Sequence, residues 1–342
     1  MRSLLLLTGE RTELAQGELR GALKALGSAQ LPEAMDDRAM YFSGLLPTGL
    51  SRRMAFCWFH GRLLALTTPD WVAIERALGE AVAHLDPNGA TSVKVVTPSR
   101  SGPISRAKLF ERSSSFLARH GFKVHHQAPD QKLFVVVGER VGVGIIDEES
   151  DRTEFATGRG PRLPFNRSIA VEPKLARAMV NLSGLPPGAT VLDPFLGPAH
   201  LAIEAAKLDL HVVGVERDSE IWHGARENIR AMSLCSGMSA HLADSRAIES
   251  TSWWEEMDRV DGIVTDPPFV RSASLMGERS ADLLHEVVAK VASKMSAGAP
   301  LVVDSDEEKT FDHLPNFNMD QMYPLRIHKS LTRFIGVLTK AN

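Results

Sequence analysis

The feature that most constrains the fold is the regular alternation of apolar strands with helical stretches in the second half of the chain. In that half, short β-rich runs alternate with segments whose apolar residues recur at helical spacing. The predicted strands lie at 190–193, 211–216, 239–243, 262–266, 301–304 and 332–338. This alternation predicts an α/β fold with a doubly wound, mostly parallel, Rossmann-like sheet, in which ligands bind at the carboxyl ends of the strands.

The first half of the chain is organised differently and predicts an α+β region. Its predicted elements are, in order, a strand at 4–7, a helix over 12–27, strands at 40–46 and 54–64, a helix over 70–85, a strand at 93–96, a helix over 105–120 and a hairpin of strands at 132–137 and 141–146. From Asp147 to Asn166 the hydrophobic periodicity disappears, and charged residues, Gly and Pro become frequent. We therefore expect the domain boundary in this stretch.

Composition and cysteine usage narrow the class of protein. A chain of 342 residues with 44% hydrophobic residues is long enough for two domains with full cores. Its formal net charge of -3 indicates no global attraction to a polyanion, so any contact with nucleic acid must be local. Cys57 and Cys235 lie far apart without zinc-like spacing, which argues against a disulfide framework or a metal site and fits the reducing cytoplasm. The apolar run at 4–7 is too short for a signal core or a membrane span.

A candidate nucleotide-binding turn follows the strand at 190–193. Gly197 allows backbone angles and a close approach that a side chain would forbid. Glu216 ends the next strand at the spacing expected for a carboxylate that holds two ribose hydroxyls. Nicotinamide-dependent enzymes share this spacing, so a dehydrogenase and a methyltransferase both stay open, beside a purely structural turn and a surface acid. Asp244 follows the third strand, where it can bond an adenine amino group or simply cap a helix.

The strand at 262–266 ends in a motif that favours methyl transfer. The exocyclic amine of a base is a poor nucleophile because its lone pair is delocalised into the ring. A carboxylate can accept a hydrogen bond from this amine, two prolines can stiffen the loop, and an aromatic ring can stack on the base. The catalytic residues predicted on this basis are Asp266, Pro267, Pro268 and Phe269. The alternative is a Pro-rich loop that only ends a strand.

These motifs resemble those of the amino-methyltransferases with a D/N-P-P-Y/F loop, and more closely the archaeal tRNA guanine-N2 methyltransferases that join a THUMP domain to a methyltransferase fold. The resemblance rests on the segments 172–178, 193–197, 266–269 and 328–333, and it is specific in the second half of the chain. It implies S-adenosylmethionine as the methyl donor and tRNA as the substrate and partner. The cofactor-binding residues that it implies are Asp193, Phe195, Gly197, Glu216 and Asp244.

The same resemblance implies an order of domains. It predicts an N-terminal ferredoxin-like module over 1–66, a THUMP-like RNA-binding domain over 67–148, a linker over 149–168 and a methyltransferase domain over 169–342. Five arginines in the linker and beyond the catalytic loop are candidates for phosphate contacts, the alternative being ordinary solvated side chains. They are Arg152, Arg159, Arg162, Arg167 and Arg271.

The cofactor turn departs from the family pattern Gly-Thr-Gly-Gly, because this chain has Gly197, Pro198, Ala199 and His200. A methyl group at Ala199 is expected to crowd the cofactor, and Pro198 lacks an N–H donor. The leading prediction is methylation of a guanine N2 amine in tRNA. The alternatives are methylation of an amino base in ribosomal RNA or DNA, and a non-catalytic RNA-binding paralogue whose turn no longer accepts the cofactor.

Overall fold

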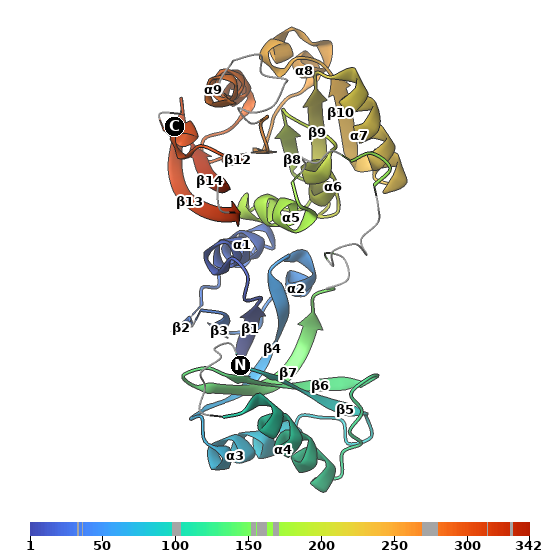
Figure 1. Cartoon of the computed structure of the whole chain (residues 1–342), viewed down its shortest axis with the longest axis vertical. Helices are drawn as coiled ribbons and strands as arrows, with labels where there is room; N and C mark the ends of the chain where they lie inside the picture. The colour runs from blue at the N-terminus through green and yellow to red at the C-terminus, as the bar shows by residue number, and fades with distance from the viewer. Residues whose placement is uncertain are drawn as a thin grey trace. The chain divides into compact units, whose positions relative to one another are not determined.

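The chain folds into two compact units. The structure, a computed structural model, describes residues 1–342 except 33, 36, 98–103, 152–154, 156–162, 167–170, 269–279, 313 and 329–330. Unit 1 comprises 1–15 and 29–151, and unit 2 comprises 16–28 and 152–342. Each unit is built around one seven-stranded sheet (Figure 1).

The sheet of unit 1 has the strand order β2-β3-β1-β4-β7-β6-β5. Its strands are β1 (Arg2–Leu7), β2 (Ala34–Met35), β3 (Ala39–Ser43), β4 (Cys57–Thr67), β5 (Thr91–Val96), β6 (Gln131–Val137) and β7 (Val141–Glu149). Strands β5 and β6 pair in parallel, and β6 and β7 form the predicted antiparallel hairpin. The helices α3 (Trp71–Val82) and α4 (Arg106–Arg119) lie side by side against this sheet (Figure 1). Buried residues such as Leu78, Leu117 and Val135 join them in one core.

The sheet of unit 2 has the order β10-β9-β8-β11-β12-β14-β13. Its strands are β8 (Thr190–Asp193), β9 (His211–Glu216), β10 (Met238–Leu242), β11 (Gly262–Thr265), β12 (Pro300–Ser305), β13 (Phe317–His328) and β14 (Leu331–Lys340). The first five in this order are parallel, and β14 and β13 are antiparallel additions at one edge. This arrangement confirms the predicted doubly wound, Rossmann-like sheet.

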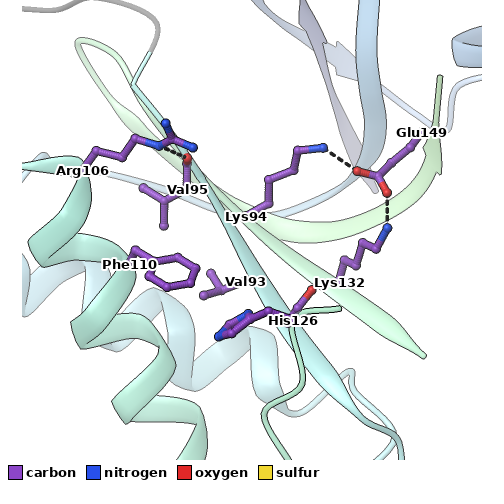
Figure 2. A pocket seen from close by; sticks show the side chains of 9 residues that line it. Val93, Lys94, Val95, Arg106, Phe110, His126, Lys132 and Glu149 are labelled. Carbon is purple, nitrogen blue, oxygen red and sulfur yellow. Dashed lines mark hydrogen bonds and ion pairs between the residues drawn. The ribbon is translucent and has the colours of Figure 1, made fainter. Parts of the chain in front are cut away.

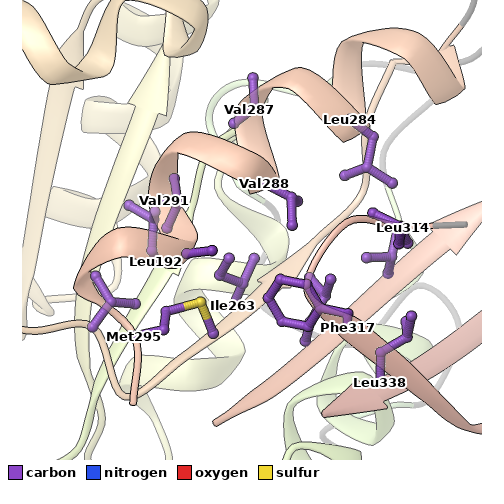
Figure 3. Close-up of a cluster of buried hydrophobic side chains, with 14 of the residues drawn as sticks. Leu192, Ile263, Leu284, Val287, Val288, Val291, Met295, Leu314, Phe317 and Leu338 are labelled. Carbon is purple, nitrogen blue, oxygen red and sulfur yellow. The ribbon is translucent and has the colours of Figure 1, made fainter. Parts of the chain in front are cut away.

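The helices of unit 2 cover the sheet and carry the turns of the site. They are α5 (Pro173–Leu182), α6 (His200–Ala206), α7 (Ser219–Ala231), α8 (Ser252–Glu256) and α9 (Ser280–Val291), with short 3-10 helices at Cys235–Gly237, Ser245–Ser250, Ala292–Lys294 and Glu308–Phe311. Figure 3 shows the apolar face of α9 pointing at the sheet, where Val288 and Val291 pack towards Leu192 and Ile263. This packing holds β8 and β11, the two strands at the centre of the sheet, in place.

Helix α1 (Thr12–Ala25) carries two glycines at the same face, one helical turn apart. A Cβ at Gly21 would lie 1.9 Å from the carbonyl oxygen of Asn181, and one at Gly17 would lie 2.1 Å from the Tyr323 hydroxyl. The fully buried Glu18, between the glycines, accepts a hydrogen bond from Nδ2 of Asn181 at 2.9 Å. Most of this early helix therefore packs as part of unit 2.

Several elements differ from the sequence-based expectation, among them the two-residue strand β2, which was not predicted. Strand β13 was not predicted, because Pro324 and alternating polar residues are untypical of a central strand, and β13 is an edge strand that tolerates them. The run expected at 40–46 ends at Ser43, because Gly44 turns the backbone to φ 109°. The short helix α2 (Leu50–Arg53) was also missed.

Candidate active site

The candidate site lies where the strand order of unit 2 reverses, between β8 and β11. Strand β8 ends at Asp193, β9 ends at Glu216, and β11 leads directly into Asp266. Because the carboxyl ends of parallel strands meet at one edge, the fold gathers predicted residues from three distant segments. This edge is the place where doubly wound sheets bind their ligands.

The turn between β8 and α6 has the left-handed backbone that a close approach requires. Gly197 has φ 51° and Ala199 has φ 70°. A Cβ at position 197 would meet no atom nearer than 3.9 Å, so open space lies beside this backbone. Ala199 is fully buried, so its methyl group packs inside the protein. The left-handed conformation costs an alanine about 1–2 kcal/mol.

A buried asparagine that the sequence did not single out supports this turn. Asn228 of α7 is completely buried, and its Nδ2 donates to the Pro198 carbonyl at 2.9 Å and to the Phe165 carbonyl at 2.8 Å. The backbone N–H of Phe165 donates in return to Oδ1 of Asn228 at 2.9 Å. Asn228 therefore connects the turn at Gly197 with Phe165, which precedes the first strand of the unit 2 sheet.

Glu216 is bonded directly to the glycine turn. Its Oε2 accepts the backbone N–H of Gly197 at 3.0 Å, and its Oε1 accepts that of Asp218 at 2.9 Å. Burial raises the pKa of Glu216, and the backbone donors Asp218, Gly197 and Arg217 partly oppose that rise. Each carboxylate oxygen has a second lone pair. With three of about four acceptor sites in use, the residue can hold the turn and still accept a hydroxyl donor.

Asp193 joins the turn to the centre of the sheet. Its Oδ1 accepts the Thr265 hydroxyl at 2.7 Å and the Phe195 backbone N–H at 3.2 Å. Burial raises the pKa of Asp193 to about 7, and the nearby charge of Glu216 adds to the rise. Phe195 is partly buried and packs against the core of unit 2. These contacts make Asp193 the residue that connects β8 with β11 beneath the turn.

Asp244 acts as a cap in the structure. Its Oδ1 accepts the backbone N–H of Arg246 at 3.0 Å, and its Oδ2 pairs with the Arg246 guanidinium at 2.7 Å. These hydrogen bonds from Arg246 lower the pKa of Asp244. These contacts show that Asp244 caps the short helix that follows it. A hydrogen bond from Asp244 to an adenine stays a prediction.

Asp266 and the two prolines follow β11 at the same edge. Asp266 is partly exposed, but its Oδ1 is buried and has no hydrogen-bond donor among the described residues. Burial raises the pKa of Asp266 well above its ordinary value, the charges of Asp304, Asp193 and Asp306 raise it further, and Arg333 lowers it. This oxygen can therefore accept a hydrogen bond from a ligand.

Asp304 and Arg333 form a pair that the sequence did not reveal as part of the site. Nη1 of Arg333 donates to Oδ2 of Asp304 at 2.8 Å, and the side chains are 12% and 0% exposed. Burial raises the pKa of Asp304 to about 7, against the opposing charge of Arg333. The available signal was that Asp304 ends a predicted strand, as the other site carboxylates do.

Several predicted residues lie outside the described part of the chain. They are Phe269 of the catalytic loop and the arginines Arg152, Arg159, Arg162, Arg167 and Arg271. Among the residues that are described, no cluster of His, Cys, Asp or Glu side chains could hold a metal ion. A search of the same residues found no helix with the length and apolar character needed to cross a membrane.

Unit 1 has a separate basic pocket of about 290 Å³ next to β5 and α4 (Figure 2). Lys94 and Lys132 both bond to the carboxylate of Glu149 there. The rings of Phe110 and His126 lie 4.8 Å apart between centroids, and Phe110 is 38% exposed. The pocket thus combines cationic groups with exposed aromatic rings, which is the combination that single-stranded nucleic acids recognise.

The fold and its edge site define a Rossmann-like α/β domain, and solved structures agree on the fold. TrmN from Thermus thermophilus has a TM-score of 0.59 and 21% sequence identity, over 99% of this chain and 100% of that one. The structure of SMU.472 complexed with SAH has a TM-score of 0.59 and 11% identity, over 99% and 98% of the two chains.

Residues 159–334 match the family model described as the RMKL-like methyltransferase domain, and the chain belongs to this family. Among curated relatives, the tRNA (guanine(10)-N2)-dimethyltransferase of Methanothermobacter thermautotrophicus is 34% identical over 194 residues, 55% of each chain. The enzyme of the same name from Pyrococcus abyssi is 28% identical over 223 residues, 64% of each chain. The similarity therefore spans about 55% to 64% of the length of these two relatives.

Proposed function

We propose that the protein transfers a methyl group from S-adenosylmethionine to the exocyclic N2 amine of a guanine in tRNA. The observation that carries the proposal is the position of Asp266. It follows the central strand at the edge where Gly197 and Glu216 form a nucleotide turn, and its buried Oδ1 has no donor among the described residues. The family match and the names of the curated relatives support the reaction class and the substrate.

The residues at the edge fit a bound methyl donor. The open space beside Gly197 admits a ligand, and Glu216 has acceptor capacity left for a ribose hydroxyl. Because the Ala199 methyl is buried, it leaves that space clear, which counts against a turn that excludes the cofactor. The bound sulfonium supplies an activated methyl group. Asp193 and Phe195 support the turn, and Asp244 is proposed to lie near the adenine.

Asp266 is the proposed catalytic residue. It accepts a hydrogen bond from the amine, orients the nitrogen lone pair towards the methyl group and stabilises the positive charge that develops on nitrogen. Pro267 and Pro268 restrict the loop that carries it. Phe269 is proposed to stack on the base once the base has left its helix.

Unit 1 is proposed to bind the RNA. The sequence-based division into a ferredoxin-like module, a THUMP-like domain and a linker is kept as part of this proposal. The basic pocket around Lys94, Arg106 and Lys132 supports it, because a chain with no global positive charge must bind RNA through a local patch. The cytoplasm is the proposed location, where tRNA is the available substrate.

The test is a methylation assay with labelled S-adenosylmethionine and total tRNA, followed by digestion to nucleosides. Label in N2-methylguanosine is expected from the wild type. Asp266→Ala is expected to lower the rate at least 100-fold, as removal of a charge-stabilising group does elsewhere, while calorimetry shows unchanged affinity for the cofactor. Label in a different nucleoside would contradict the proposed substrate, and failure of the wild type to bind S-adenosylmethionine would contradict the reaction.

A further inference from the structure

The parallel pairing of β11 with β12 sets two carboxylates beside each other at the candidate site. Thr265 lies opposite Val303 in this pair, and the next residues along the two strands are Asp266 and Asp304. Parallel strands lie about 4.8 Å apart, and residues opposite each other point to the same face. The side chains of Asp266 and Asp304 are therefore neighbours, and the charge of Asp304 raises the pKa of Asp266.

Each of the two carboxyl groups has a buried oxygen that lacks a donor. Oδ1 of Asp266 and Oδ1 of Asp304 both accept no hydrogen bond from any described residue, and Asp304 as a whole is 0% exposed. The cation that faces both is Arg333, which donates to Oδ2 of Asp304. Asp193 from β8 and Asp306 after β12 add further negative charge to the same surroundings.

Among the described residues, the single positive charge of Arg333 cannot compensate the carboxyl groups of Asp266 and Asp304 and their two acidic neighbours. In such surroundings a pair of carboxyl groups retains one proton at neutral pH, and that proton belongs to the pair rather than to either residue. Burial and the charge of Asp304 raise the pKa of Asp266 well above normal, and burial together with the charge of Asp306 raises that of Asp304 to about 7. A shared proton also supplies the donor that two orphan oxygens lack.

We propose that Asp304 is a positioning residue that shares one proton with Asp266 and takes that proton over when a substrate amine reaches Asp266. This inference rests on the proposed amine methylation. With the proton on Asp304, Asp266 is a carboxylate that accepts the amine hydrogen bond. The N–C bond then forms as the S–C bond breaks with its electron pair going to sulfur, and the surplus proton of the methylated nitrogen passes to Asp266 and finally to water.

Two substitutions should shift the pH dependence of kcat in opposite directions. Asp304→Asn removes a negative neighbour, so the pKa of Asp266 falls and the acid limb of the profile moves down by about one pH unit or more. Arg333→Gln removes the positive neighbour, so the acid limb should move up by about one pH unit.

Arg333→Lys retains the charge and should keep the acid limb of the wild type, and Asp258→Asn, at an exposed acid, should leave the whole profile unchanged. A structural role alone would lower kcat at every pH without displacing the limb. Equal or absent shifts in the Asp304 and Arg333 variants would overturn the proposal.

Infrared spectroscopy tests the shared proton independently of activity. A protonated carboxyl band should weaken as the pH rises above 7, and Asp266→Asn should remove part of that band, the rest belonging to Asp193. An unchanged band in Asp266→Asn would overturn the shared proton. Absence of methyl transfer by the wild type in the presence of this band would instead refute the proposed function.

Discussion

The hydrogen bonds of Glu216 predict what its amide variant will do. Both of its carboxylate oxygens accept backbone N–H groups, and an amide nitrogen in place of one oxygen would face a donor. Glu216→Gln should therefore disturb the turn at Gly197 and weaken binding of S-adenosylmethionine by about 10- to 100-fold, the loss expected for one or two hydrogen bonds to a charged group. Calorimetry checks this prediction, with Glu227→Gln, at an exposed acid of α7, as the control. Unchanged affinity in Glu216→Gln would remove this residue from the cofactor site.

The raised pKa of Asp193 predicts how the stability of unit 2 depends on pH. The folded carboxyl group holds its proton up to about pH 7, whereas an unfolded one loses it near pH 4. The folded state thus binds more protons in this window, so this group makes the unfolding free energy fall as pH rises from about 4 to 7, by about 4 kcal/mol at most. Asp193→Asn should flatten the profile by that amount in denaturant unfolding without cofactor, and Glu256→Gln should not.

At the scale of elements, two glycines within helices should respond oppositely to the same substitution. A Cβ at Gly21 of α1 would lie 1.9 Å from the Asn181 carbonyl oxygen, which is backbone and cannot move aside cheaply. Gly21→Ala should therefore destabilise unit 2 by about 3 kcal/mol. A Cβ at Gly79 of α3 would meet only Phe116, at 4.0 Å, so Gly79→Ala should stabilise unit 1 by about 0.5–1 kcal/mol.

Denaturant unfolding followed by circular dichroism measures both changes. Because the two substitutions are chemically identical, the propensity of alanine for helices cancels in the comparison. Stabilisation by Gly21→Ala would mean that α1 does not pack closely on α5 in solution.

The sequence predicted the elements whose pattern is local. Apolar runs bounded by turn residues identified the central strands of unit 2, and the order of strands and helices identified their parallel arrangement. Strand β13 was not predicted, because Pro324 is untypical of a strand unless the strand lies at the edge of a sheet. Helix α1 was located, but its packing within unit 2 depends on contacts with Asn181 and Tyr323 that no local pattern encodes.

The same distinction applies to the candidate site. Gly197 and Glu216 could be paired from their spacing because a strand–turn–helix unit fixes it. Asp304, Arg333 and Asn228 could not, because each acts through a partner that only the register of the sheet or the packing of a helix brings near. Residues within one strand–turn–helix unit and its following strand could be selected from the sequence. Residues that support the site from other elements could not.

In the whole molecule, unit 1 is proposed to bind the RNA and unit 2 to transfer the methyl group. In the basic pocket of unit 1, the carboxylate of Glu149 pairs with both Lys94 and Lys132 and offsets one of their two positive charges (Figure 2). Lys132→Gln should weaken tRNA binding about three- to tenfold and reduce the slope of log affinity against log salt by about one, because one phosphate contact is lost. Affinity for the cofactor should not change.

Glu149→Gln should do the opposite, since it releases both lysines to bind phosphate. We expect tRNA binding to tighten several-fold and the salt slope to grow, again with unchanged cofactor affinity. Fluorescence anisotropy with labelled tRNA at several salt concentrations measures both variants, and Lys309→Gln, at an exposed site in unit 2, is the matched control. If loss of Lys132 and loss of Glu149 change the affinity in the same direction, charge in this pocket does not govern RNA binding, and the RNA must be held by another surface of the chain.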